Sequence, residues 1–187
     1  RSTQAKTLFP YTTLFRSDTA IKNKNIRLWY FKEFIYCAAI RRTELTLIKV
    51  RDILDDTILI RAEVSKNKKQ ESIIINKKLK EIIIQMELHK YSPDDFIFGY
   101  KLQTCSVQFA NPNHISTAHT NICKDENIRS ECTLYSWKHT GVIKLYEKTK
   151  DAYLVMRHLR HYSLEMTMIY LKSLGINADI RLREIAW

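Results

Sequence analysis

Basic, imidazole and phenol side chains recur along the chain in five short segments that contain the residue types used in phosphate chemistry. The segments are Ala39–Leu45, Ser65–Lys69, Leu134–Gly141, Leu159–His161 and Thr167–Leu171. A lysine-rich turn such as the second can enter a DNA groove and bring an ammonium to a phosphate, although a solvated turn is the commoner explanation. Arg41 and Glu44 would share one helical face, where such pairs are usually surface ion pairs. A single His or Tyr is more often packed, so only the ordered set points to catalysis.

The composition is that of a globular protein with a surplus of basic residues. The 187 residues are 45% hydrophobic and 27% charged, and 31 Lys and Arg face 20 Asp and Glu, a net charge of +11. This surplus favours a polyanionic partner, although ribosomal, membrane-surface and nuclease proteins share it. The longest apolar runs, Ile73–Ile75 and Ile82–Ile84, are too short to span a bilayer. With no secretory start either, we expect a cytoplasmic protein.

The four cysteines are scattered along the chain. Cys37, Cys105, Cys123 and Cys132 form no C-x-x-C pair. The pattern therefore predicts neither a zinc site nor a disulfide scaffold, but reduced thiols.

The first 17 residues match a laboratory sequence. Residues 7–17 are the in-frame translation of a common sequencing-adapter primer, and residues 1–3 match the adapter segment just upstream. A natural N-terminal arm is the alternative, but eleven consecutive matches favour the adapter. Removing 17 from 187 residues leaves 170, and losing three of the 31 basic residues leaves a net charge of +8. We expect that the true N-terminus has been lost.

Hydrophobic patterns predict the elements that position the first two segments. Ile26–Ile40 is dense in aromatic and aliphatic residues, as in a buried helix, and Arg42–Ile48 has the pattern of a second helix start. Thr57–Val64 alternates, which predicts a strand with Ile58, Ile60, Ala62 and Val64 on one face. Ser65–Gln70 is then a turn, and Ser72–Asn76 the return strand.

The rest of the chain is predicted to be helical, except for residues 100–130, whose pattern is polar and indicates only a helix after Pro112. Ser163 is placed to cap the last helix, with Glu165 in its first turn. The fold class is therefore mainly α with a small antiparallel β-hairpin. The predicted helices are Leu79–His89, Leu134–Lys148, Ala152–Leu159 and Leu164–Leu174, and the first ends at the Ser92–Asp95 turn.

In this order the segments resemble the catalytic boxes of tyrosine recombinases, the phage and conjugative-transposon integrase family. Those boxes are an Arg followed three residues later by Glu, a hairpin Lys, H-x-x-R-H-T, L-G-H, and a nucleophilic Tyr nine residues on. The resemblance extends from Ile26 to Leu174. The matching residues are Arg41 with Glu44, Lys66, Tyr135 with Lys138-His139-Thr140, Leu159-Arg160-His161, and Tyr170.

The chain departs from the family's boxes at several positions. Tyr135 stands in place of the usual His and Lys138 in place of the usual Arg, a version that resembles one branch of mobile-element integrases. Arg160 replaces a Gly, and Ala38-Ala39 replace Thr-Gly. The resemblance implies a tyrosine recombinase catalytic domain over residues 18–174, a C-terminal tail over 175–187, and the absence of the family's N-terminal core-binding domain.

The resemblance also implies a mechanism without metal or cofactor. Tyr170 would attack a DNA phosphate and form a 3′-phosphotyrosyl link, with cations nearby favouring its phenolate. Arg41 would hold both non-bridging oxygens with its planar fork, Lys138 would add charge, and His161 would donate a hydrogen bond.

The remaining site residues have supporting roles in this scheme. Lys66 would protonate the leaving 5′ oxygen as general acid, and the Tyr135 hydroxyl would donate to the phosphate. Glu44 would orient Arg41, His139 would be structural, and Lys66, Lys68 and Lys69 would bind DNA.

The family implies double-stranded DNA as partner and a homotetramer on two recombination sites, in the bacterial cytoplasm at the nucleoid. A type IB topoisomerase and a catalytically silent DNA-binding module are the alternatives. Covalent trapping on a nicked site and relaxation of supercoils distinguish them.

Overall fold

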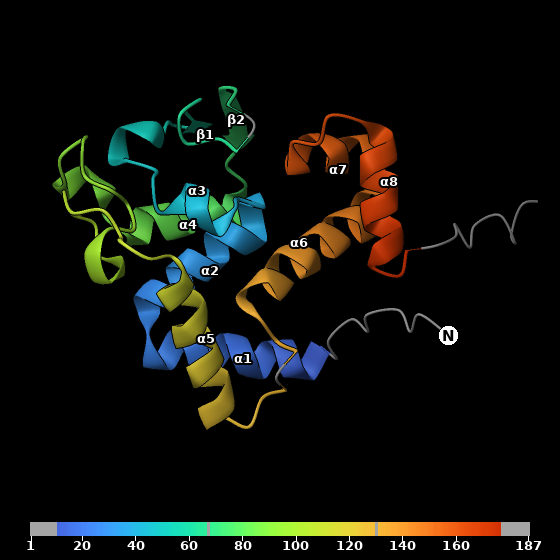
Figure 1. The fold of residues 1–187 in the computed structure, drawn as a ribbon, viewed down its shortest axis with the longest axis horizontal. Coiled ribbons are helices and arrows are strands. Elements are labelled where there is room, and N and C mark those ends of the chain that lie inside the picture. Colours follow the sequence, from blue (N-terminus) through green and yellow to red (C-terminus); the bar gives the residue numbers. More distant parts are fainter. Residues whose placement is uncertain (1–10, 67, 130, 177–187) are drawn as a thin grey trace, which may run out of the picture. The chain divides into compact units, whose positions relative to one another are not determined.

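The computed structural model describes residues 11–66, 68–129 and 131–176 (Figure 1). The chain divides into two compact units, of which the larger extends to Val142 and the smaller begins at Ile143. Helix α6 (Leu134–Thr149) therefore starts in the larger unit and ends in the smaller. Among the described residues, no helix combines the length and the apolar character that crossing a membrane requires.

Helix α2 (Ile26–Ala38) is the central element of the larger unit, and it confirms the predicted buried helix. Asn25 caps its start by accepting a hydrogen bond from the Leu28 N–H at 3.0 Å. The rings of Phe31 and Phe34 both meet Phe98 edge-on, with centroids 5.0 and 5.3 Å away. Such edge-to-face packing adds to the free energy gained by burying the rings, so the helix is surrounded by core.

Two charged residues of α2 are buried with the apolar ones. The Lys32 ammonium pairs with the carboxylates of Glu33 and of Asp18, which lies in α1 (Tyr11–Lys24). Lys78, from α4 (Lys77–Gln85), approaches Glu33 Oε2 at 2.6 Å. A buried charge is tolerated only when it is paired. Lys32 and Glu33 find their partners on neighbouring helices, so this network joins α1, α2 and α4.

The predicted hairpin is confirmed, with shorter strands. β1 (Thr57–Ile60) pairs antiparallel with β2 (Glu71–Ile74), and Ile58 lies opposite Ile73. The chain leaves β1 at Arg61, whose carbonyl accepts hydrogen bonds from the N–H groups of residues 64 and 65. The prediction that Ala62 shares the buried face was therefore wrong, because Ala62 lies in this turn and is exposed.

Short elements complete the larger unit. The helix expected over Arg42–Ile48 lasts only one turn, because the Leu47 N–H bonds back to the Glu44 carbonyl and the chain then enters a bridge between Lys49 and Phe96. The helix expected to reach His89 stops earlier, because Glu87 adopts a left-handed conformation with φ 50°. These elements are α3 (Arg42–Leu45), η1 (Val50–Asp52), η2 (Leu88–Lys90), η3 (Tyr100–Leu102) and α5 (Asn113–Asp125).

Gly141 lets the first turns of α6 approach α2 closely. A Cβ atom at this position would lie 2.0 Å from the Tyr36 carbonyl oxygen, closer than any side chain permits. One helical turn earlier, the buried Trp137 ring meets the Tyr36 ring edge-on at 6.3 Å. The part of α6 that holds Tyr135 and Lys138 is thus fixed against α2.

The smaller unit contains the end of α6 with α7 (Ala152–Leu159) and α8 (Leu164–Ser173), close to their predicted bounds. Ser163 caps α8 by accepting from the Met166 N–H at 3.2 Å, which confirms the predicted cap. Val155 and Leu171 are buried. The fold class is confirmed: mainly helical, with one two-stranded antiparallel sheet in the described residues.

The segment assigned to a sequencing adapter lies partly outside the described residues. Residues 11–17 form the first half of α1, and Ser17 is buried with its Oγ 3.7 Å from Cys123 Sγ. The assignment concerns the origin of these residues and stays a prediction. Most of the predicted tail, residues 177–187, also lies outside the described residues.

Candidate active site

One buried carboxylate joins the first two predicted boxes. Glu44 Oε1 accepts a hydrogen bond from Arg41 Nη1 at 2.7 Å and another from the Lys66 backbone N–H at 3.2 Å. Its Oε2 accepts from the Arg41 backbone N–H at 3.2 Å. The Glu44 side chain is 2% exposed and that of Arg41 26%. A charge-assisted bond in partial burial holds the guanidinium in one orientation, with part of it still open to a ligand.

Backbone geometry places Arg41 at the start of α3. Helix α2 ends with Ala39 in the left-handed region, at φ 51° and ψ 25°. Arg41 is extended, at φ −73° and ψ 142°, and is the N-cap residue of α3. A left-handed position after a helix normally takes glycine, because any Cβ is strained there. Ala39 stands where the family usually has Gly, and it still adopts the left-handed conformation that ends α2.

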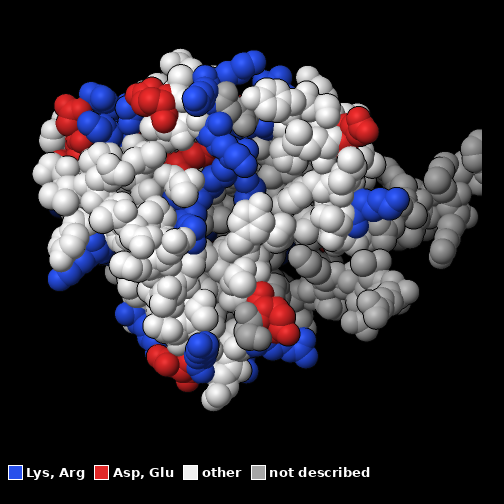
Figure 2. All heavy atoms as spheres, viewed as in Figure 1, with Lys and Arg blue, Asp and Glu red and all other residues white. Residues whose placement is uncertain are grey.

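The hairpin lysines lie on the surface of the larger unit. Lys66, Lys68 and Lys69 are exposed, and Lys68 has a left-handed φ of 51°. Figure 2 shows Lys and Arg side chains gathered in a band over the part of the larger unit that holds α3 and the hairpin. Glu44 accepts a hydrogen bond from the Lys66 backbone N–H, and the Lys66 side chain is exposed.

The second box lies at the start of α6. Lys138 is buried at 5% exposure, whereas Tyr135, one turn earlier, is 55% exposed. The His139 ring packs edge-on against the Tyr135 ring with centroids 4.6 Å apart. The structural role expected of His139 stays a prediction.

The third box and the predicted nucleophile lie together in the smaller unit. The His161 and Tyr170 rings meet edge-on, with centroids 5.7 Å apart and planes at 89°. His161 follows Arg160, which ends α7 in the left-handed region with φ 58°, at the position of the family's usual Gly. The end of one helix and the middle of the next therefore bring imidazole and phenol side by side.

Thr167 holds the His161 ring, a contact that the sequence analysis did not anticipate. Its Oγ1 lies 3.0 Å from His161 Nδ1 and donates to the Ser163 carbonyl at 3.3 Å. A hydroxyl has one proton, so in this arrangement it accepts from the Nδ1–H. Nε2 then donates to a DNA oxygen only when the ring is doubly protonated or the hydroxyl reverses. The only sequence signal was a threonine one helical turn after the Ser163 cap.

The predicted site residues thus form separate groups. Arg41, Glu44 and Lys66 make one group in the larger unit, and His161 and Tyr170 another in the smaller unit. Their catalytic roles stay predictions.

Possible metal ligands occur among residues to which the sequence assigned no catalytic role. In the described part of the chain, His119, Cys123 and Cys132 bring ligand atoms within 4.8 Å of one another. The cysteines are scattered in the sequence, so spacing alone did not indicate that these three side chains meet. Their proximity depends on the packing of α5 against the loop before α6.

A model of the phage integrase family matches residues 9–175. The chain belongs to that family. The tyrosine recombinase XerH of Campylobacter jejuni subsp. jejuni serotype O:2 is 28% identical over 152 residues, which are 80% of this chain and 42% of that relative.

Solved structures share the fold. The XerA recombinase superposes with a TM-score of 0.70 at 16% identity, covering 98% of this chain and 64% of that one. A lambda integrase tetramer bound to a Holliday junction gives a TM-score of 0.72 at 16% identity, covering 96% and 52%. The chain therefore spans less than two thirds of the length of these relatives.

Proposed function

We propose that this chain is the catalytic part of a site-specific DNA recombinase that cleaves and rejoins strands through a 3′-phosphotyrosyl intermediate. The observation that best supports it is the buried Glu44 carboxylate, which binds both Arg41 and the backbone of Lys66. A surface ion pair would need neither the burial nor the second contact. The arrangement instead suits a cation fixed beside a mobile lysine, as cleavage of a phosphodiester requires.

Each group has one task in the proposed cleavage step. The Tyr170 phenolate oxygen attacks the phosphorus, the bond to the 5′ oxygen breaks, and Lys66 gives that oxygen its proton. Arg41 and Lys138 stabilise the charge on the non-bridging oxygens, and His161 donates a hydrogen bond there.

The remaining roles follow from position. The exposed Tyr135 hydroxyl donates to the phosphate, while Glu44 and His139 hold their neighbours in place. Lys66, Lys68 and Lys69 bind the DNA backbone, an interaction that salt weakens. Attack of a 5′ hydroxyl on the phosphotyrosine then reverses the chemistry and joins a new strand, which needs no ATP, metal or cofactor.

Double-stranded DNA is the proposed substrate and a homotetramer on two sites the proposed assembly, at the bacterial nucleoid. The lambda integrase tetramer on a Holliday junction supports this assembly for a protein of the same fold. Two active subunits on each of two sites are what reciprocal strand exchange requires.

Covalent trapping tests the proposal without knowledge of the recombination site. The purified chain is incubated with a pool of nicked duplexes whose arms are randomised, so that the short cleaved fragment diffuses away and the adduct accumulates. Adducts that survive denaturation are recovered, and their DNA is sequenced and rebuilt as an intact site. Joining of two such sites supports a recombinase. Absence of any adduct contradicts the proposal, and relaxation of supercoils without joining would instead indicate a topoisomerase.

A further inference from the structure

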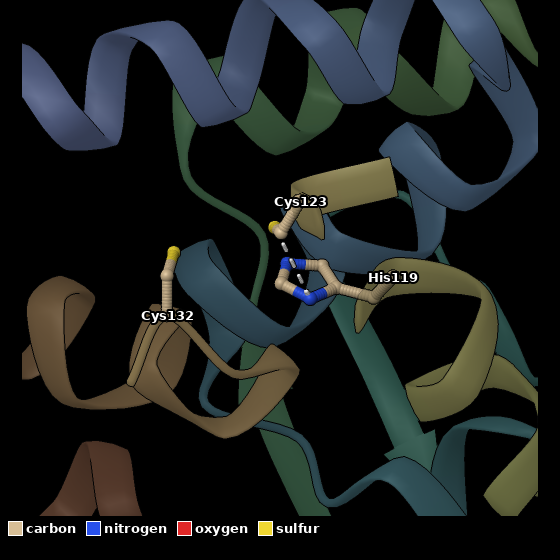
Figure 3. Close-up of side chains that lie close together, drawn as sticks. All are labelled: His119, Cys123 and Cys132. Atoms are coloured by element: carbon tan, nitrogen blue, oxygen red, sulfur yellow. Dashed lines mark hydrogen bonds between the residues drawn. The ribbon is translucent and has the colours of Figure 1, made fainter. Parts of the chain in front are cut away.

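A buried polar cluster lies in the larger unit, outside the residues assigned to catalysis. His119 and Cys123 are one turn apart on α5, and Cys132 lies in the loop before α6 (Figure 3). Ser17 of α1 and Trp137 of α6 complete the cluster, and all five side chains are buried.

The Trp137 indole N–H can only donate, so it determines where the other hydrogen atoms of this cluster lie. Trp137 Nε1–H points at His119 Nε2, 3.0 Å away, so that nitrogen is the acceptor. The ring proton of neutral His119 is therefore on Nδ1, which lies 3.8 Å from Cys123 Sγ. His119 thus donates toward the Cys123 sulfur.

A second donor chain ends at the same sulfur. The Cys132 thiol donates to Ser17 Oγ at 3.6 Å, and Ser17 Oγ lies 3.7 Å from Cys123 Sγ. The single Cys132 proton is donated to Ser17, so the hydrogen bonding of Cys132 reaches Cys123 through the Ser17 hydroxyl. Together with His119, it lowers the pKa of the Cys123 thiol to about 4 despite burial. The same pairing and burial raise the pKa of Cys132. The cluster therefore places a thiolate beside a thiol.

The tautomer of His119 argues against a metal at this position. A histidine that binds a metal through Nδ1 carries its proton on Nε2. That proton would point at the Trp137 N–H, leaving two buried donors face to face. The thiolate and thiol instead meet the requirement for disulfide formation, in which a thiolate attacks and a second sulfur closes the bond.

We propose that Cys123 and Cys132 are a redox-active pair that closes into a reversible disulfide. The oxidant is a small-molecule disulfide, RSSR. The Cys123 thiolate attacks one of its sulfurs and expels RS⁻, leaving a mixed disulfide. The Cys132 thiol gives its proton to the released RS⁻, and its sulfur then displaces the second RS⁻ from Cys123. The products are the protein disulfide, one RSH and one RS⁻, and two electrons have passed to the oxidant.

The two sulfur atoms lie close together but not at bonding distance. The Cys123 and Cys132 sulfur atoms lie within 4.8 Å of each other. A local movement of Cys132, which is in a loop, must therefore close the remaining gap to a disulfide bond. Both thiols are buried, so the oxidant reaches them only when the protein opens locally. The proposal does not depend on Ser17, because His119 alone gives Cys123 a donor.

Cys37 is a matched control within the same chain. It is also buried, but its thiol donates to the Glu33 carboxylate at 3.6 Å. Burial, with the neighbouring Glu33 charge, raises the pKa of Cys37 to about 12. Cys37 is thus a protonated thiol that itself donates to a carboxylate, and we expect it to resist the same oxidant.

Peptide mapping tests the pair directly. The Cys105→Ser protein is incubated with hydroxyethyl disulfide, blocked with iodoacetamide during unfolding, and digested with trypsin without reduction. The expected product joins peptide 102–124 to peptide 130–138, has lost two hydrogens, and reverts with dithiothreitol, while Cys37 is alkylated. Recovery of Cys123 and Cys132 as alkylated thiols would overturn the proposal, as would a purified protein holding one zinc that a chelator removes.

Two variants separate the roles within the cluster. His119→Gln keeps an acceptor for the Trp137 N–H but donates more weakly, so the disulfide should form several-fold more slowly. Added to the Cys105→Ser protein, Cys132→Ser should stop the reaction at a mixed disulfide on Cys123, detected as one added hydroxyethylthio group. A Cys132→Ser protein that gains no such group would contradict the assignment of Cys123 as the attacking sulfur.

Discussion

Replacing Glu44 with Gln should both destabilise the larger unit and impair the proposed site. Gln keeps the shape of the side chain but removes its charge and one of its two acceptor atoms. Glu44 accepts hydrogen bonds from the Arg41 guanidinium at 2.7 Å and from the backbone N–H groups of Arg41 and Lys66, each at 3.2 Å. In either orientation of the amide, its NH₂ faces at least one of these donors.

The size of the effect follows from burial. A hydrogen bond to a charged group contributes about 1.5–3 kcal/mol, and an unsatisfied buried donor costs about 1–3 kcal/mol. Because the Glu44 side chain is 2% exposed, water cannot replace the hydrogen bonds that Glu44 loses. We expect the free energy of unfolding to fall by about 2–4 kcal/mol, a shift of the urea midpoint of about 1–2 M.

Glu63→Gln is the matched control. Glu63 also pairs with an arginine, at 2.6 Å from Arg61 Nη1, but its side chain is 66% exposed. Solvent and salt screen such an exposed pair, so this variant should unfold close to the parent. Urea unfolding, followed by circular dichroism, measures both. A Glu44→Gln loss no larger than that of Glu63→Gln would refute the argument that one buried carboxylate holds the two boxes together.

Substitutions at three further positions address single groups. Lys66→Ala should slow cleavage of ordinary DNA but not of a 5′-bridging phosphorothiolate, whose sulfur leaves without protonation; equal defects on both substrates would mean that Lys66 only binds phosphate. Lys138→Ala should reduce cleavage by about 100-fold or more with far less effect on DNA binding, and Lys138→Arg should retain measurable activity. If the Ala variant cleaves like the parent, Lys138 is not in the site. Gly141→Ala should lower stability by about 1–3 kcal/mol in thermal or urea unfolding, although Ala is the better helix former, because its methyl group collides with the Tyr36 carbonyl. A gain in stability would contradict this packing.

Local patterns in the sequence predicted much of the fold, because helices and hairpins depend on nearby residues. The Ser163 cap and the bounds of α7 are examples, since capping and apolar spacing are both local. The shortened β1 strand could not be predicted in this way. Its end depends on the turn after Arg61, whose guanidinium binds Asp52 of η1, and that contact is a product of tertiary packing.

In the candidate site too, contacts between nearby residues could be predicted and contacts between distant residues could not. Arg41 and Glu44 are three residues apart and do pair, as expected. The prediction of a shared helical face was wrong, because Arg41 is extended and is the N-cap residue of α3. The bond from Glu44 to the Lys66 backbone joins residues 22 positions apart and needed the structure. The approach of His119, Cys123 and Cys132 was missed for the same reason, since no motif spacing relates a helix to the loop that follows it.

The identity of the nucleophile is the most direct test of the proposed chemistry. A nicked duplex selected by covalent trapping is incubated with the parent, with Tyr170→Phe and with Tyr162→Phe, which removes an exposed phenol of the same unit. The adduct is digested with a protease and its DNA-linked peptide identified by mass spectrometry. We expect the parent and Tyr162→Phe to give an adduct on the peptide that contains Tyr170, and Tyr170→Phe to give none while DNA affinity stays within a few-fold. An adduct that persists in Tyr170→Phe, or that maps to another tyrosine, would contradict the account.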